Sequence, residues 1–74
     1  MSDGDIETYQ AGGMWHNRIV GEKCVLSSHL KKQDAEGAGR VFAERRQVRH
    51  IVRSLVGRVL SERRYDDVGA AAPG

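Results

Sequence analysis

Three histidines and one cysteine are the side chains in this sequence that could bind a metal ion or pair a nucleophile with a base: His16, Cys24, His29 and His50. Zinc-binding sequences are marked by closely spaced ligand pairs such as Cys-x-x-Cys, and none is present here. A catalytic thiol needs a lowered pKa and a base that orients it, whereas Cys24 begins an apolar stretch in which a buried, inert thiol is the usual outcome. We therefore predict no metal site, no catalytic residue and no cofactor, and expect that the protein is not an enzyme.

Arginines concentrate in the C-terminal half of the chain. Residues 31–64 carry ten basic and four acidic side chains, whereas residues 1–30 carry two basic and four acidic ones. Guanidinium groups bind phosphate oxygens in bidentate fashion, so such a cluster suits a nucleic-acid backbone. The candidate contact residues are Arg45, Arg46, Arg49, Arg53, Arg58, Arg63 and Arg64. Solvated arginines are also common on ordinary surfaces and the net charge is only +2, so a weak, sequence-tolerant nucleic-acid-binding domain is the alternative hypothesis.

A small core and two exposed apolar residues favour a different function. A chain of 74 residues buries only about 60% of the surface of its unfolded form, so its core is thin. A single cysteine excludes an internal disulfide, which leaves dimerisation as the leading way to complete the core. Leu55 and Val56 form a candidate apolar contact at an expected turn. The first hypothesis is therefore a small protein-interaction module that binds itself as a homodimer, or binds another protein.

We expect no export or membrane signal from the residue pattern. Its opening, MSDGDIET, is acidic and polar, unlike a secretory signal. Its apolar runs are two or three residues long, far short of the roughly 20 needed to cross a bilayer. We expect a cytoplasmic location, no membrane partner and no small-molecule substrate, because so small a domain offers little room for a pocket.

The spacing of apolar residues predicts the elements that position these side chains. Alternating residues separated by glycine-containing turns predict three short strands over residues 5–10, 14–20 and 24–28. Two more strands are expected over 48–54 and 59–65. The turn between the last two is expected to be a type I turn with a bulge, because only Gly57 then takes a positive φ and Val56 does not.

Residues 32–46 change to helical spacing. Their small and apolar side chains form one stripe of Ala35, Ala38, Gly39 and Phe42, with Ala43 flanking. We expect this amphipathic helix to lie close to the sheet, with Phe42 as its main anchor.

Together these elements predict an α+β domain in which a small antiparallel sheet, with the element order βββαββ, packs on one amphipathic helix. The domain is expected over residues 5–66, with a flexible N-terminus at 1–4 and a disordered tail at 67–74. Ile51 and Val52, and likewise Val59 and Leu60, are all candidate core residues. The buried face of the last two strands therefore stays open.

A set of short motifs follows the same order of elements. They are Trp15 in an early strand, Lys32-Gln33-Asp34-Ala35 opening the helix, Gly39 and Ala43 within it, Gly57-Arg58 in the late hairpin, and Tyr65 at its end. Over about residues 5–66 this pattern resembles the short bacterial proteins, common in actinobacteria and their phages, grouped as domain of unknown function 2188. The resemblance implies a compact domain of one sheet and one helix, and it points to no particular activity.

The chain departs from that pattern at two positions. Lys31 stands where the family usually has a threonine N-cap, and losing such a cap costs about 1 kcal/mol. The acidic side chain of Asp34 near the helix N-terminus offsets part of this cost. Val56 stands where the family usually has aspartate before the hairpin glycine, which adds to the apolar character of the turn.

Overall fold

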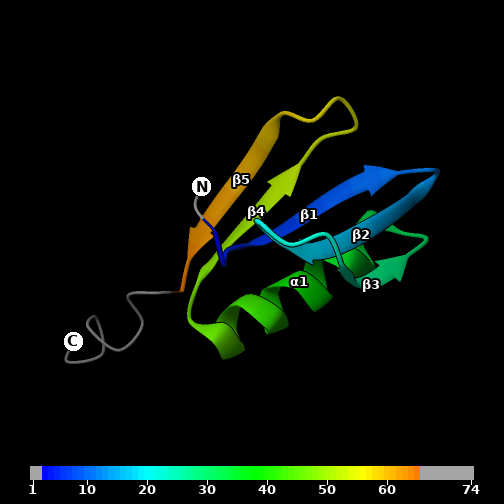
Figure 1. The fold of residues 1–74 in the computed structure, drawn as a ribbon. Coiled ribbons are helices and arrows are strands. Elements are labelled where there is room, and N and C mark those ends of the chain that lie inside the picture. The colour runs from blue at the N-terminus through cyan, green and yellow to red at the C-terminus, as the bar shows by residue number, and fades with distance from the viewer. Residues whose placement is uncertain (1–2, 66–74) are drawn as a thin grey trace.

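The computed structural model describes residues 3–65 and has the predicted order of elements (Figure 1). The elements are β1 (Ile6–Ala11), β2 (Met14–Ile19), β3 (Val25–His29), α1 (Lys32–Arg46), β4 (Arg49–Arg53) and β5 (Val59–Arg64). The helix packs on the sheet, so the predicted α+β class is confirmed. Residues 1–2 of the expected N-terminus and 66–74, which include the expected tail, lie outside the described residues.

The five strands form one mixed sheet in the order β3-β2-β1-β4-β5. Antiparallel pairing, as expected, joins β1 to β2, β2 to β3 and β4 to β5, but β1 and β4 run parallel. The physical reason is the connection through α1, which carries the chain from edge strand β3 back to the sheet centre beside β1. A crossover connection of this kind is what parallel neighbours require.

The predicted turn chemistry of the last hairpin is confirmed. Gly57 has a φ of 86°, and Gln47 is the one non-glycine residue with positive φ among residues 3–65. The hydrogen bond from the Gly57 amide to the Ser54 carbonyl closes the turn at 3.0 Å. Val56 therefore keeps an ordinary backbone conformation and is available to carry an apolar side chain at the tip.

The helix has its predicted bounds but buries a slightly different stripe. Ala35, Gly39 and Ala43 are buried, at a spacing of four residues, whereas Phe42 is only partly buried. Phe42 packs against the core from the edge of this stripe, and the small residues bring the helix close to the sheet. Lys31 makes no side-chain cap hydrogen bond, as expected.

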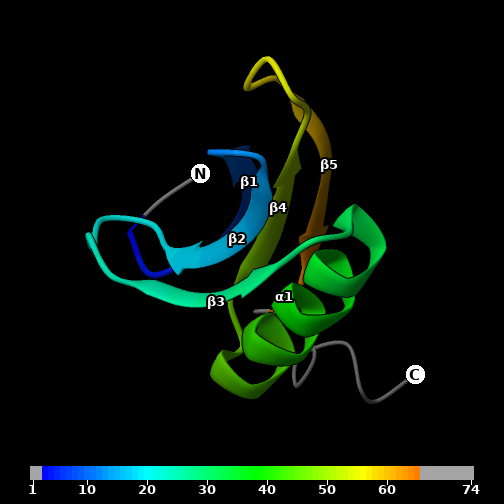
Figure 2. The ribbon, with the colours of Figure 1, turned by 90° about the vertical axis from the view of Figure 1, so that its right-hand side faces the viewer.

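The core lies between α1 and the sheet, with the helix on one side of the curved strands (Figure 2). Its apolar cluster is Ile6, Ile19, Ala43 and Tyr65, with Leu26, Phe42 and Val48 packed against it. Within the described residues, no helix is long and apolar enough to cross a membrane.

The two last strands differ in burial. Ile51 and Val52 of β4 are both buried, on opposite faces of the sheet, whereas Val59 and Leu60 are about half exposed. Of the four candidate core residues, only the pair on β4 belongs to the core, because β4 lies between two strands and β5 lies at the edge.

Candidate functional site

A network of hydrogen-bonded polar side chains lies buried between the sheet and the helix. Thr8 and Asn17 have no exposed surface and His50 is 6% exposed. The Thr8 hydroxyl lies 2.5 Å from Oδ1 of Asn17 and 2.7 Å from Nε2 of His50. Asn17 also donates from Nδ2 to the carbonyl of Ala35, at 3.0 Å, and to the hydroxyl of Ser27, at 3.1 Å. The network ties strands β1, β2, β3 and β4 to the first turn of α1, and its hydrogen bonds offset the cost of burying polar groups.

Gly39 is the residue that lets the helix pass over this network. A Cβ atom at this position would lie 2.5 Å from Nε2 of His50, 2.6 Å from Oδ1 of Asn17 and 2.7 Å from Oγ1 of Thr8. No real side chain tolerates such distances. The glycine is therefore required by close approach and not by its backbone angles.

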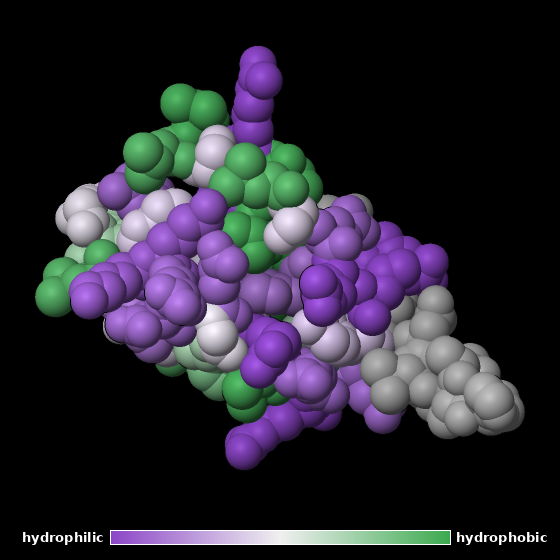
Figure 3. All heavy atoms as spheres, turned by 180° about the vertical axis from the view of Figure 1, so that it is seen from behind, coloured by the Kyte–Doolittle hydropathy of each residue, from purple (hydrophilic) through white to green (hydrophobic). Residues whose placement is uncertain are grey.

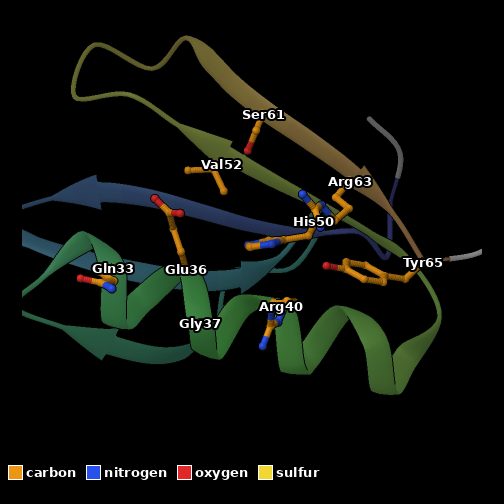
Figure 4. Close-up of a pocket in the computed structure, with 9 residues that line it drawn as sticks. All are labelled: Gln33, Glu36, Gly37, Arg40, His50, Val52, Ser61, Arg63 and Tyr65. Atoms are coloured by element: carbon orange, nitrogen blue, oxygen red, sulfur yellow. The ribbon is translucent and has the colours of Figure 1, made fainter.

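Beside this network, a groove runs between the flank of α1 and the helix-side face of β4 and β5 (Figure 4). It has a volume of about 410 Å³ and is lined by Gln33, Glu36, Gly37, Arg40, His50, Val52, Ser61, Arg63 and Tyr65. In Figure 4 the His50 ring and the Tyr65 phenol point into the space between helix and sheet, and Glu36 reaches up from the helix. The groove therefore contains a carboxylate, two guanidinium groups, a phenol and an imidazole.

The pKa of His50 is lowered. Burial of the imidazole lowers the pKa most, the nearby Glu36 carboxylate raises it, and the Arg63 guanidinium lowers it again. The neutral ring is thus the favoured form, because a buried imidazolium would lose its hydration.

The opposite face of the sheet, which we call the open face, contains a buried carboxylate. Glu7 is 3% exposed and accepts from Nε of Arg18 at 2.7 Å and from Nε of Arg53. Burial acts to raise the pKa of Glu7, but the hydrogen bonds from Arg53 and Arg18 and their charges outweigh it and hold the pKa below its usual range. Arg18 also lies 5.0 Å from the ring centre of Tyr9. Arginine here serves to cover and neutralise an internal charge.

The seven candidate arginines do not form one surface. Arg49 and Arg64 are cross-strand partners on the open face, and Arg49 also pairs with Glu62 at 3.2 Å. Arg53, on the same face, binds Glu7 and the Gly57 carbonyl.

The other four arginines lie elsewhere. Arg63 pairs with His50 in register and lines the groove on the helix side. Arg45 and Arg46 occupy the last turn of α1, and Arg58 lies in the hairpin before β5. The charges are thus divided between two faces and two ends, and nucleic-acid binding stays a prediction from the sequence.

Apolar side chains gather instead at the β4–β5 hairpin. Leu55 is 67% exposed and Val56 81%, and Val59 and Leu60 of β5 are 51% and 52% exposed. We call these four residues the hairpin patch. In Figure 3 apolar side chains gather at the upper left, at the end of the molecule that holds this hairpin. A shallow depression of about 500 Å³ joins the patch to Trp15, which lies under Lys32.

The residues first considered for metal binding or catalysis are placed apart. His16 binds the Ser28 hydroxyl and the Ala11 carbonyl, and His29 binds Ser27. Cys24 is exposed and precedes β3, which corrects the expectation of a buried thiol. Among residues 3–65, no three His, Cys, Asp or Glu side chains are grouped so that they could hold a metal ion.

The sequence reading missed the buried polar network and the groove beside it. Thr8 and Asn17 occupy inward positions of the predicted strands, where apolar residues are expected, so polar residues at those positions were the available signal. Nothing in the spacing indicated that His50, which comes from a distant strand, would join them.

Comparison with known proteins returned no matching family model, and no curated protein and no solved structure matches the chain. The resemblance to domain of unknown function 2188 stays a prediction.

Proposed function

We propose that this protein is a non-enzymatic protein-interaction module that forms a homodimer through β5 and the hairpin patch. The observation that carries the proposal is the exposure of β5: it is an edge strand, and all six of its residues are exposed. An uncovered edge with apolar side chains is a template for pairing with another strand.

The backbone of β5 supports strand pairing. The amide of Tyr65 donates to the Val48 carbonyl of the neighbouring chain segment. Because successive residues of a strand alternate in direction, the Arg63 amide points toward β4 and the Glu62 amide points away from it. The outward amide of Glu62 is therefore available to a second strand.

A second copy of the chain fits this edge chemically. Antiparallel pairing of β5 with itself about a twofold axis near Leu60 places Val59 and Leu60 at the centre of the contact. The same pairing brings Arg58 of one copy near Glu62 of the other, on both sides of the axis. The apolar centre and the opposite charges at its flanks are complementary, as an isologous interface requires.

Sedimentation equilibrium of the full chain tests the proposal. We expect a dimer that is lost in Val59→Asp, because a charged side chain would replace an apolar one at the centre of the contact. Val25→Asp is the matched control, since Val25 is 43% exposed against 51% for Val59 and lies on β3, the opposite edge of the sheet.

The behaviour of the two variants distinguishes pairing through β5 from its absence. Loss of the dimer in Val59→Asp with retention in Val25→Asp supports pairing through β5. A wild-type monomer at high concentration, or equal behaviour of the two variants, contradicts it.

A further inference from the structure

The hydrogen-bond network fixes which nitrogen of His50 carries the proton. The Ala35 carbonyl can only accept, so the Asn17 amide must turn its Nδ2 toward it and its Oδ1 toward Thr8. The Thr8 hydroxyl then donates its one proton to Asn17. To bind His50 as well, Thr8 must accept from Nε2. In the neutral ring the proton therefore sits on Nε2, and Nδ1 is a bare acceptor.

The bare nitrogen faces the groove. Among the described residues, no hydrogen bond involves Nδ1 of His50, and no fully buried side-chain nitrogen or oxygen lacks a partner. Nδ1 is therefore accessible, and His50 lines the groove beside α1. The lowered pKa of His50 keeps this nitrogen unprotonated at neutral pH.

Charges of opposite sign lie on the two sides of His50 along the groove. Glu36 lies toward the start of the helix, and Arg40 and Arg63 lie toward its other end, beside Tyr65 (Figure 4). Both Glu36 and Arg63 act on the His50 ring electrostatically. Strands β1 and β2 present the neutral Thr8 and Asn17 to it.

The existing ion pairs of these groups are weak. Glu36 lies 3.7 Å from Lys32, and Arg40 lies 3.7 Å from Glu44, with all four side chains well exposed. Long, solvent-exposed pairs of this kind contribute little and are readily exchanged for a ligand.

We propose that this groove binds a small zwitterion of the amino-acid class, with an ammonium group and a carboxylate on one short chain. The ammonium donates to Nδ1 of His50 and to the Glu36 carboxylate. The carboxylate accepts from Arg63 and Arg40. The groove volume of about 410 Å³ falls within the usual range of about 300–1,000 Å³ for small-molecule sites. This proposal goes beyond the proposed function: the groove uses the helix-side face of β5, through Ser61 and Arg63, whereas the homodimer contact uses the outer edge of that strand.

The charge pattern excludes the simpler ligands. A plain anion would meet the Glu36 carboxylate and a nitrogen with no proton to give. A plain cation would meet two guanidinium groups. A ligand with both charges avoids both repulsions, so this arrangement of charges in the groove favours a zwitterion over either single-charge ligand.

NMR titration of the full chain, labelled with ¹⁵N, tests the proposal. The probes are glycine, β-alanine and 4-aminobutanoate, which differ in the spacing of the two charges, with acetate and methylammonium as single-charge comparisons. We expect a free Nδ1 resonance for His50 that shifts saturably with one of the zwitterions. The groove should bind this zwitterion about tenfold more tightly than it binds acetate or methylammonium, which is the effect of one charge-assisted hydrogen bond.

Two variants and a control sharpen the result. Glu36→Gln should weaken zwitterion binding about tenfold but strengthen acetate binding, because it removes the carboxylate that repels a plain anion, and Arg63→Gln should weaken both. Glu22→Gln is the matched control, because Glu22 is exposed in the turn between β2 and β3 and does not line the groove. It should leave all the affinities unchanged.

Three results would overturn the proposal: a proton on Nδ1, no saturable shift with any zwitterion, or acetate binding as tightly as the best zwitterion. The titration is repeated in Val59→Asp. Binding that survives in this variant separates the groove from the dimer, so that failure of one proposal is distinguishable from failure of the other.

Discussion

Strands β4 and β5 are hydrogen-bonded neighbours, yet they belong to two different regions of the molecule. In β4, His50, Ile51 and Val52 are buried, whereas every residue of β5 is exposed. The helix covers one face of β4, and the Glu7–Arg53 pair lies on the other face. Strand β5 lies at the edge of the sheet, where neither of these covers it. In this small domain a residue is therefore buried when its strand is central in the sheet and covered by the helix. Apolar side chains of β5, which the helix does not cover, remain exposed.

The largest effect on the free energy of unfolding is expected at Gly39, where the helix lies closest to the sheet. Gly39→Ala places a methyl group against His50, Asn17 and Thr8, and should lower the free energy of unfolding by about 3 kcal/mol through overpacking and broken hydrogen bonds. Gly37→Ala is the control on the same helix, since its Cβ would meet nothing within 4 Å. It should raise the free energy of unfolding by about 1 kcal/mol. Urea unfolding measures both, and equal effects would refute the close approach.

A smaller loss of stability is expected on the open face of the sheet. Glu7→Gln leaves Arg18 and Arg53 without their shared carboxylate, and should cost about 2 kcal/mol because that carboxylate is buried and bonded to both. Glu62→Gln removes the partner of Arg49, but both of these side chains are partly exposed, so the cost should stay below about 0.5 kcal/mol. Urea unfolding at low protein concentration compares the two. Equal costs would show that burial of Glu7 does not matter.

The pH dependence of stability tests the neutral state of His50. An unfolded histidine titrates near 6.5, and burial lowers the folded pKa below that value. Between the two values the unfolded chain binds more protons, so stability falls as the pH is lowered below 6.5 and is fully present above it. Unfolding free energies measured on each side of pH 6.5 should show this slope in the wild type, and His50→Gln should flatten it. A slope unchanged by the substitution would assign it to other groups.

The smallest effect is expected in the hairpin patch. Leu55→Asp changes a side chain that is 67% exposed, so the free energy of unfolding of the monomer should change by less than about 0.5 kcal/mol. Thermal unfolding at low concentration measures it. A large loss would place Leu55 in the core and remove the contrast between the two regions.

Much of the fold could be predicted because the local preferences of the sequence, such as helical spacing and glycine turns, agree with the tertiary packing. Helical spacing set the bounds of α1, and glycines set the hairpin turns. The parallel β1–β4 pair could not be predicted, since it depends on where the crossover returns the chain. Val59 and Leu60 look like core residues in sequence, and only the edge position of β5 exposes them. Thr8 and Asn17 break the apolar alternation, but their partner His50 is brought to them by the parallel pairing itself.

The proposed homodimer through β5 is tested most directly by hydrogen exchange at the Glu62 amide. Its rate is measured by NMR at low and high protein concentration, with the Arg63 amide, which points toward β4, as the internal reference. We expect the Glu62 amide to become protected from exchange as the protein concentration rises, while the Arg63 amide is protected at every concentration. A Glu62 amide that exchanges at one rate across all concentrations would contradict it.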